Sequence, residues 1–420
     1  MHGALERIAF FDQTISQRVK IILMKRRDFL KKSALASTSF MVPSFLNAFS
    51  GKPLLRSRSG KVLVVVQFSG GNDGLNTIIP YQNDIYYQNR PSLAIPKGEV
   101  LKVGYELGFN PKMSGLQSLY DEGLLSVINS VGYPNPDRSH FRSMDIWHTA
   151  SDSDQYLSSG WLGRYLDSNC QRCETPYHAL EVDDHLSLAL KGNHRNGFAM
   201  SNPKQLKRTT DNRFLKTLAK HDHGHEEENV AYLYKTMIDT QSSADYLFQQ
   251  SKVHQSGVEY PRTSFGQDLK QISELITADT DTKVYYVSLT GFDTHANQRG
   301  QQERLLQQYA EGMKAFVKDL RQNNLLDDTL IMTFSEFGRR VKQNASRGTD
   351  HGTANNLFLI GGNLKKPGFF NEAPDLLNLD NGDLIYQIDF RRIYATILED
   401  WLEANPASIL TGQFEKLKFV

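Results

Sequence analysis

The chain has 420 residues, of which 39% are hydrophobic and 23% are charged. This composition is typical of a folded α/β protein of one large or two ordinary domains, and argues against disorder or a membrane bundle. The formal net charge is +1. Eight basic and three acidic side chains fall in residues 1–48, a net of +5, so the rest of the chain carries −4. A mildly acidic body of this kind gives no basic surface for nucleic acid.

The N-terminal segment has the order of charge and hydropathy of a secretory signal. From Met24 it reads Met-Lys-Arg-Arg-Asp-Phe-Leu-Lys-Lys-Ser, and an apolar stretch containing Ala and Ser then runs to Phe49. The pair Arg26-Arg27 followed by Phe29-Leu30 resembles the twin-arginine export motif. Residues 1–50 are therefore predicted to be an N-terminal extension and a twin-arginine signal, with a basic amphipathic surface helix as the alternative.

This signal predicts a periplasmic or otherwise exported protein that uses the twin-arginine export machinery. Cleavage is expected near Leu46-Asn47-Ala48, and Met24 is a natural start, so residues 1–23 are either translated or upstream of the true start. No later apolar run reaches the roughly 18 residues needed to cross a bilayer, so we expect no membrane span.

The body of the chain alternates apolar runs with helical patterns. Strands are predicted at 61–68, 124–131, 283–289, 329–334 and 357–360. Helices are predicted at 112–122, 139–150, 266–277, 300–323 and 389–403. Such alternation predicts a three-layer α/β sandwich around a mainly parallel sheet over residues 58–420.

Two segments depart from this pattern. Residues 197–262 are polar and helical in periodicity, which predicts a helical cap inserted into the α/β domain. Within them, the tract at 221–226 (His-Asp-His-Gly-His-Glu) is either a solvated loop or a metal-binding tract. Cys170 and Cys173 form a C-x-x-C pair, interpreted as a surface disulfide because its polar surroundings lack the strand-to-helix context of a redox-active pair.

Polar residues gather where the predicted strands end, and ligands bind beyond the carboxyl ends of strands in open parallel sheets. The residues at these positions are Asp73, Ser139, His140, Asp293, His295, Glu336, Asp350 and His351. Carboxylates and imidazoles brought together in this way are the usual ligands of zinc, manganese or magnesium. The strand ends therefore predict a metal centre.

Ser139 opens a predicted helix, where the positive end of the helix dipole stabilises an anionic group or an alkoxide nucleophile. Arg138 and Arg142 lie nearby as candidates for holding phosphate or sulfate oxygens. Each candidate has a structural alternative: Asp73 orders its glycine-rich turn, Ser139 is only an N-cap, Glu336 pairs with Arg339 or Arg340, and the histidines are buried in satisfied contacts.

Several segments together resemble the domain-of-unknown-function 1501 family, over nearly all of the chain after the signal. The matching stretches are Gly70-Gly71-Asn72-Asp73-Gly74-Leu75-Asn76-Thr77, Arg138-Ser139-His140-Phe141, Gly160-Trp161-Leu162-Gly163-Arg164-Tyr165, Phe292-Asp293-Thr294-His295, Ser335-Glu336-Phe337-Gly338-Arg339-Arg340 and Gly348-Thr349-Asp350-His351-Gly352. This family looks like a branch of the alkaline phosphatase/sulfatase superfamily. The resemblance implies a two-metal site and a Ser/Thr-type nucleophile above the sheet.

The resemblance carries over residue by residue. Asp73 is similar to the superfamily's first metal-binding aspartate, Ser139 to its nucleophile and His351 to its last histidine. Its Asp-x-x-x-His pair is only approximated by Asp293-Thr294-His295, and its later Asp-His pair appears here as Ser335-Glu336. These departures bear most on the second metal.

The sequence thus predicts a metal-dependent hydrolase of phosphate or sulfate esters, with an anionic ester or a polysaccharide as substrate. One or two divalent ions are expected on Asp73, Asp293, His295, Glu336 and His351, with Asp350 as a ligand or as the partner of one. Ser139 is the expected nucleophile, and His140 and Arg142 are expected to orient the oxyanion.

Two alternatives remain open. One is a non-catalytic relative that binds polysaccharide or a partner protein. The other is a metal-free serine hydrolase, although no Gly-x-Ser-x-Gly elbow surrounds Ser139.

Overall fold

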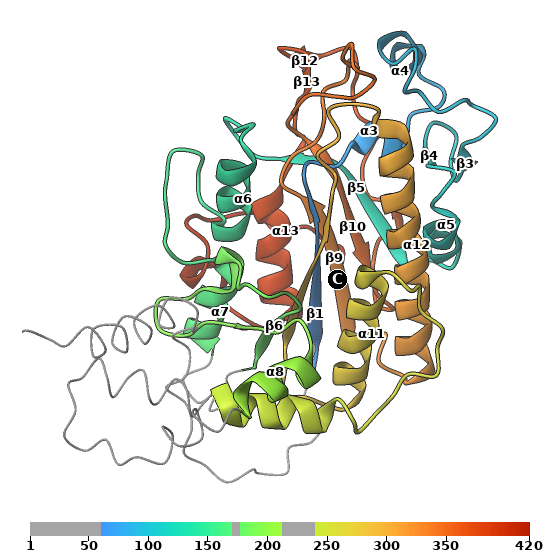
Figure 1. Ribbon diagram of the computed structural model, residues 1–420. Coiled ribbons are helices and arrows are strands. Elements are labelled where there is room, and N and C mark those ends of the chain that lie inside the picture. The colour runs from blue at the N-terminus through green and yellow to red at the C-terminus, as the bar shows by residue number, and fades with distance from the viewer. Residues whose placement is uncertain (1–59, 170–176, 212–239) are drawn as a thin grey trace, which may run out of the picture. The chain divides into compact units, whose positions relative to one another are not determined.

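A computed structural model describes residues 60–169, 177–211 and 240–420 (Figure 1). The predicted export signal, the cysteine pair and the histidine-containing tract lie outside these residues. Within them, no helix is both long and apolar enough to span a bilayer.

A nine-stranded sheet forms the middle layer, in the order β11-β5-β10-β9-β1-β8-β6-β7, with β14 also paired to β5. Its strands are β1 (Val62–Ser69), β5 (Leu125–Gly132), β6 (Ala179–Glu181), β7 (Phe198–Ala199), β8 (Val284–Thr290), β9 (Thr329–Ser335), β10 (Asn355–Ile360), β11 (Gly368–Phe369) and β14 (Ile388–Asp389). All pairings are parallel except those of β10, which runs antiparallel to both β5 and β9. The mainly parallel sheet is confirmed.

The reversed direction of β10 matters for the site. In a fully parallel sheet, the loop that precedes a strand lies at the opposite edge from the loops that follow the other strands. Because β10 is antiparallel, residues before Asn355 lie at the same edge as those after Ser69, Thr290 and Ser335. Asp350 and His351 therefore reach the carboxyl-end edge of the sheet.

Helices cover both faces of the sheet (Figure 1). One layer contains α5 (Ser114–Asp121), α11 (Ser264–Thr277) and α12 (Gln298–Gln322), and the other contains α6 (His140–Thr149), α7 (Trp161–Asn169) and α13 (Phe390–Thr396). Alternate residues of β1 enter the two cores: Val64 and Val66 pack in the first, Leu63 and Val65 in the second. A strand buried on both faces explains the continuous apolar run, and the three layers are confirmed.

Smaller elements complete the described chain. They are α3 (Gly74–Thr77), α4 (Asp84–Asn89), α8 (Pro203–Thr210), the sheet of β2 (Ile78–Ile79), β3 (Leu101–Lys102) and β4 (Gly108–Phe109), the hairpin of β12 (Leu379–Asp380) and β13 (Asp383–Leu384), and the 3₁₀ turns Leu188–Leu190 and Pro406–Ser408.

Three features differ from the sequence prediction. The predicted closing helix over 389–403 is α13 followed by a π-helical turn at Ile397–Trp401. The short edge strands β6 and β7 were not predicted, because two or three residues carry no readable periodicity. Strand β7 lies inside the range 197–262 predicted as an inserted cap, in which α8 and residues 240–250 are helical.

Candidate metal centre

The glycine-rich loop after β1 allows three loops to meet. Gly70 and Gly71 have φ angles of +117° and +73°, a region that disfavours side chains. A Cβ on Gly70 would lie 2.4 Å from the backbone N of Asp293, and one on Gly71 would lie 2.2 Å from the Phe337 ring. The two glycines therefore let the loops after β8 and β9 pack directly against the end of β1.

A short antiparallel ribbon brings the loop before β10 alongside the loop after β9. The backbone N–H of Gly352 donates to the carbonyl of Gly338, that of Gly338 donates to the carbonyl of Thr353, and Arg339 pairs with His351. A Cβ on Gly352 would lie 2.6 Å from the carbonyl carbon of Arg339, so glycine is needed at that crossing. The ribbon sets the position of His351.

Helix α6 is held against the sheet by buried polar contacts. The Nε2 atom of His148 lies 3.1 Å from both Gln67 Oε1 on β1 and the Tyr286 hydroxyl on β8. Burial lowers the pKa of His148 to about 4, so this histidine is neutral in the fold. These contacts fix the helix whose first residue is His140.

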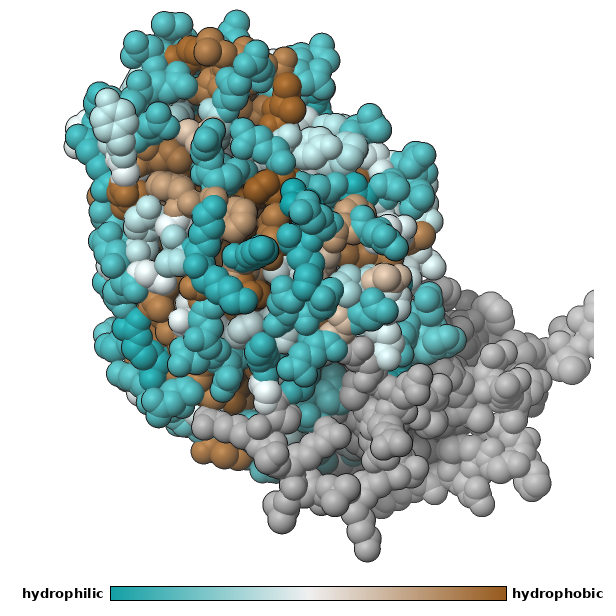
Figure 2. Space-filling model, turned by 180° about the vertical axis from the view of Figure 1, so that it is seen from behind, coloured by the Kyte–Doolittle hydropathy of each residue, from teal (hydrophilic) through white to brown (hydrophobic). Residues whose placement is uncertain are grey.

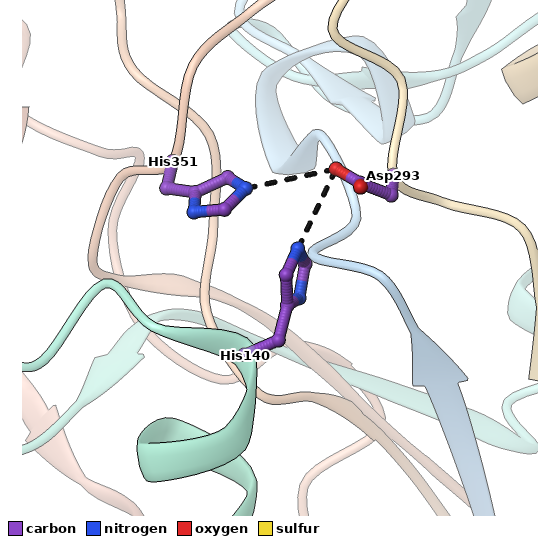
Figure 3. A group of neighbouring side chains, drawn as sticks. All are labelled: His140, Asp293 and His351. Carbon is purple, nitrogen blue, oxygen red and sulfur yellow. Dashed lines mark ion pairs between the residues drawn. The ribbon is translucent and has the colours of Figure 1, made fainter.

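Three imidazoles converge on one carboxylate oxygen, Asp293 Oδ1. The Nε2 atoms of His295, His140 and His351 lie 3.0, 3.5 and 3.6 Å from it. His295 Nε2 and His351 Nε2 are 2.9 Å apart. Figure 3 shows the rings of His140 and His351 pointing at Asp293 from α6 and from the loop before β10.

The other nitrogen of each ring faces an acceptor. Nδ1 of His140 lies 2.9 Å from Glu336 Oε1, and Nδ1 of His351 lies 2.7 Å from the carbonyl oxygen of Arg138. Because both acceptors require a donor, each Nδ1 carries the proton, and each Nε2 presents a lone pair to the centre. Nδ1 of His295 faces Asp350 Oδ1 at 3.5 Å. Metal-binding histidines usually have this arrangement.

Two observations test whether these residues fit a metal ion. The Nε2 atom of His140 is buried and has no hydrogen-bond partner, a condition that a cation relieves. Four of the six separations among these donor atoms are 2.9–3.6 Å. Tetrahedral ligands with bonds of about 2.0–2.1 Å are separated by about 3.3 Å. Asp293, His140 and His351, whose donor atoms lie within 4.8 Å of one another, therefore fit a divalent ion, and His295 lies next to Asp293 and His351 as a candidate fourth ligand.

Arg339 lies beside these donors and is fully buried. Its guanidinium donates to the carbonyl oxygens of Gly70, Gly71, Phe292 and Thr349, and to Asp293 Oδ1 at 2.9 Å. One side chain thus joins the loops after β1 and β8 to the loop before β10, and places a permanent positive charge against the central carboxylate.

The electrostatics of the donors follow from their neighbours. Burial raises the pKa of Asp293, but the hydrogen bond and charge of Arg339 outweigh this effect and lower it overall. The hydrogen bond that His140 donates to Glu336 raises the pKa of His140 against its desolvation, whereas burial lowers the pKa of His351. Asp293 is consequently a carboxylate at neutral pH, as a metal ligand must be.

The predicted metal residues divide into two groups. Asp293, His295 and His351 are brought together at the centre, while Glu336 and Asp350 lie behind the histidines as their hydrogen-bonding or ionic partners. Glu336 pairs with neither Arg339 nor Arg340. His140, predicted to orient an oxyanion, instead lies among the nitrogen donors.

Asp73 is not part of this group. Its carboxylate is fully buried against Arg90, whose NH1 donates to Oδ2 at 2.6 Å, and it also accepts a hydrogen bond from Gln298. The side chain thus fastens the loop after β1 to the segments that carry Arg90 and α12.

The remaining predicted residues lie around the start of α6. Ser139 occupies the N-cap position and is exposed, and its side chain makes no capping hydrogen bond. Arg142 turns away from the centre: its guanidinium donates to the carbonyl oxygens of Asp152, Ser153 and Gln155. Arg142 thus stabilises the loop after α6.

Sequence reasoning missed the positions of Arg339 and Arg90. Arg339 was recognisable only as a member of the Ser335–Arg340 motif, and was considered as a partner of Glu336. Nothing in the sequence around Arg90 signals a buried ion pair, because its partner lies 17 residues away in another loop.

Several solved structures are similar to this chain. The zinc complex of the C-terminal periplasmic domain of EcEptC from Escherichia coli is 12% identical, covers 76% of each chain and has a TM-score of 0.36. The lipoteichoic acid synthase LtaP from Listeria monocytogenes is 9% identical, with 77% of this chain and 71% of that chain covered and a TM-score of 0.34. A protein in the alkaline phosphatase superfamily from Vibrio parahaemolyticus is 11% identical, with 84% and 73% covered and a TM-score of 0.31. Similarities of this size transfer neither a substrate nor a mechanism.

The sequence comparisons identify the family. No curated protein matches the chain. The profile of the family described as "Protein of unknown function (DUF1501)" matches residues 99–398, a range that includes every donor of the metal centre. The chain therefore belongs to the DUF1501 family.

Proposed function

We propose that this chain is an exported, metal-dependent hydrolase of phosphate or sulfate esters with a single-ion centre. His140, His295, His351 and Asp293 hold the ion, and Ser139 is the nucleophile. Zinc is the ion that a set of three imidazoles and one carboxylate suits best, with manganese as the next choice. Export rests on the twin-arginine motif at Arg26-Arg27.

One observation carries the proposal. Three Nε2 lone pairs meet at one carboxylate oxygen, and the rings are held from behind by Glu336, Asp350 and the Arg138 carbonyl. A structural network of histidines would have to satisfy Nε2 as well as Nδ1. His140 Nε2 is buried without a hydrogen-bond partner and has only the 3.5 Å contact with Asp293, and an unsatisfied buried atom typically costs about 1–3 kcal/mol.

The charges around the donors favour one ion. The neighbouring carboxylates are Asp293, Glu336 and Asp350, and the neighbouring cation is Arg339. With neutral imidazoles, their sum of −2 balances one divalent ion and leaves a second ion uncompensated beside a buried guanidinium. Asp73 adds nothing to this sum, because Arg90 neutralises it.

The chain's own residues supply the rest of the chemistry. A bound ion would act as a Lewis acid that stabilises developing negative charge and lowers the pKa of a nearby hydroxyl. Ser139 leaves the N–H groups at the start of the ten-residue helix α6 without a side-chain cap, so they can bind an anionic ester oxygen. The exposed Ser139 hydroxyl attacks phosphorus or sulfur, and the bond to the alcohol breaks as a Ser139 ester forms. The hydroxyl proton passes through solvent to the leaving alcohol, and water then hydrolyses the Ser139 ester to regenerate the hydroxyl.

The test uses natively exported protein. Metal content is measured by elemental analysis, and hydrolysis is measured on a panel of aryl phosphate, phosphodiester and sulfate esters, for wild type and for Ser139→Ala. We expect one equivalent of metal in both proteins, and turnover only in the wild type. Absence of metal, together with turnover unaffected by Ser139→Ala, contradicts the proposal. Labelling of Ser139 by a fluorophosphonate in the presence of a chelator would instead support a metal-free serine hydrolase.

A second candidate is a non-catalytic relative that binds polysaccharide or a partner protein. The specific observation in its favour is that Arg142 and Asp73, both predicted to serve catalysis, are engaged in structural contacts. Binding of a polysaccharide that survives removal of metal, without turnover of any ester on the panel, would favour this candidate.

A further inference from the structure

A pocket of about 170 Å³ lies next to the metal centre, on the far side of the Phe337 ring. The ring of Phe337 lies 4.8 Å from that of His140 and 4.7 Å from that of His351, and it also lines the pocket. The other walls come from the loop after β5 (132–137), from α6, from the start of β10 (353–354) and from the β12–β13 hairpin and the residues after it (380–386).

One residue that lines the pocket, Asp137, is two positions before the proposed nucleophile in the sequence. Oδ1 of Asp137 accepts the backbone N–H of Ser139 at 2.6 Å. Ile385 stands at the rim with half of its surface exposed. Figure 2 shows hydrophobic side chains on the surface at the end of the molecule that carries β12 and β13. A group joined to an ester at Ser139 can therefore extend into this pocket.

The lining combines apolar walls with hydrogen-bonding groups. Tyr133, Trp147, Phe337 and Leu384 provide the walls, while Asp137, Asp380 and Asn135 provide the polar atoms. Trp147 also has an indole N–H that is buried and has no hydrogen-bond partner. Asp137 and Asp380 each already accept one hydrogen bond, but an alkyl chain would leave the Trp147 indole N–H unpaired, which disfavours a purely apolar ligand.

The charges disfavour an anionic ligand. Two carboxylates line the pocket and no lysine or arginine does. The nearest guanidinium groups, those of Arg138 and Arg340, are both paired with the buried Asp383. The phosphate or sulfate group therefore belongs at the metal centre, and the pocket suits the uncharged part of the ester.

The ring geometry disfavours an ammonium ligand. Trp147 is stacked between Phe334, at 4.9 Å, and Phe390, at 4.2 Å, so its edge and not its face is left for the pocket. Cation–π binding requires the face of the ring, and an unpaired N–H donor repels a cation. A ligand with both hydroxyl donors and acceptors satisfies the carboxylates and the indole together.

We infer that this pocket binds the alcohol part of the substrate, and that this part is a neutral sugar ring. The inference takes the ester from the proposed function and adds the class of its leaving group. A volume of about 170 Å³ is smaller than drug-sized sites of about 300 Å³ or more, so it suits one ring and not an oligosaccharide.

The test measures binding of the alcohol part alone. Methyl glycopyranosides of glucose, galactose, mannose and N-acetylglucosamine are titrated against the full chain by ligand-observed NMR, with choline and 1-hexanol as comparison probes. The variants are Asp380→Ala, which removes an exposed carboxylate, and Ile385→Trp, which fills the rim. Asp121→Ala on α5 is the matched surface control. All of these side chains are exposed, so folding is expected to persist and is verified by circular dichroism.

At least one glycoside is expected to bind more tightly than either comparison probe. Both pocket variants are expected to weaken that binding at least tenfold, and the control to leave it unchanged. The inference is overturned if no glycoside binds, if choline or hexanol binds better, or if both pocket variants bind within twofold of wild type. The titration is run with and without a chelator, and the metal content of the protein is measured in parallel. Glycoside binding by a chain that contains no metal would refute the proposed hydrolase while supporting the sugar pocket.

Discussion

Replacing Glu336 with glutamine separates charge from geometry at the metal centre. Oε1 of Glu336 accepts two hydrogen bonds, from the backbone N–H of Gly70 at 2.8 Å and from Nδ1 of His140 at 2.9 Å. A glutamine whose carbonyl takes the place of Oε1 keeps both bonds. Its amide group then lies near the Ser335 hydroxyl, which is 3.2 Å from Oε2 in the native protein. Only the negative charge behind His140 is lost.

The size of the effect follows from the position of that charge. Glu336 is fully buried, so water and salt screen it little. Loss of an outer partner of a ligating histidine typically lowers metal affinity about 10- to 100-fold, or about 1.4–2.7 kcal/mol. The equivalent change at the exposed Asp350, 3.5 Å from His295, should cost less than about 1 kcal/mol because solvent screens it.

Competition against a chromophoric chelator measures both changes on the metal-loaded chain. Glu303→Gln, which alters a half-buried carboxylate paired with Arg299 on α12, is the control and should bind metal like wild type. We expect an order of decreasing affinity from wild type through Asp350→Asn to Glu336→Gln. Equal affinity of wild type and Glu336→Gln would refute the assignment of His140 as a ligand held by a buried carboxylate.

Four further predictions follow from the same contacts. His351→Ala removes a donor and should weaken metal binding by more than the roughly hundredfold limit of outer substitutions, as measured by the same competition. Arg339→Met leaves Asp293 and several carbonyl groups unpaired and should cost about 3–5 kcal/mol in urea unfolding, whereas Arg340→Met should cost under about 1 kcal/mol. Burial raises the pKa of Glu181 to about 8, so the folded chain holds this proton more tightly than the unfolded chain does. The free energy of unfolding should therefore fall by about 1.4 kcal/mol per pH unit between pH 4.5, the ordinary pKa, and about pH 8. Glu181→Gln should flatten this pH dependence in melting curves. A free metal concentration of 100 times the dissociation constant adds about 2.7 kcal/mol to the free energy of unfolding. Removing the metal with a chelator should therefore lower the melting temperature by several degrees.

The sheet could be predicted because its strands are buried on both faces. Residues 62–66 are five consecutive apolar residues, a pattern typical of a strand buried on both faces, and the helices between the strands indicate parallel crossovers. The direction of β10 could not be predicted from its own residues, because an apolar run looks the same whether the strand is parallel or antiparallel to its neighbours. The one available hint was that 336–354 lacks a helical pattern, although parallel crossovers usually contain a helix.

The site was predictable in its membership more than in its roles. Strand ends identified Asp293, His295 and Glu336 as neighbours, because parallel strands deliver their carboxyl ends to one edge. His351 reaches the same edge because β10, which it precedes, runs antiparallel. Which ring nitrogen faces the centre depends on the acceptor behind it, and for His351 that acceptor is a backbone carbonyl with no sequence signature. For His140 that acceptor is the carboxylate of Glu336, which is 196 residues away in the sequence.

Charge pairing is the reason for proposing one ion in place of the two-metal arrangement that the resemblance implies. Two carboxylates that the resemblance assigns to metals, Asp73 and Asp293, each have a buried guanidinium within 2.9 Å. Arg90 and Gln298 both pair with Oδ2 of Asp73, and Oδ1 of Asp73 is buried without a hydrogen-bond partner. Arg339 leaves Asp293 able to bind, since its guanidinium lies to one side while three imidazoles reach the same oxygen. In the proposed single-ion centre the two arginines therefore have different roles: Arg90 neutralises Asp73, and Arg339 offsets part of the negative charge around Asp293. A second equivalent of tightly bound metal per chain would contradict both roles.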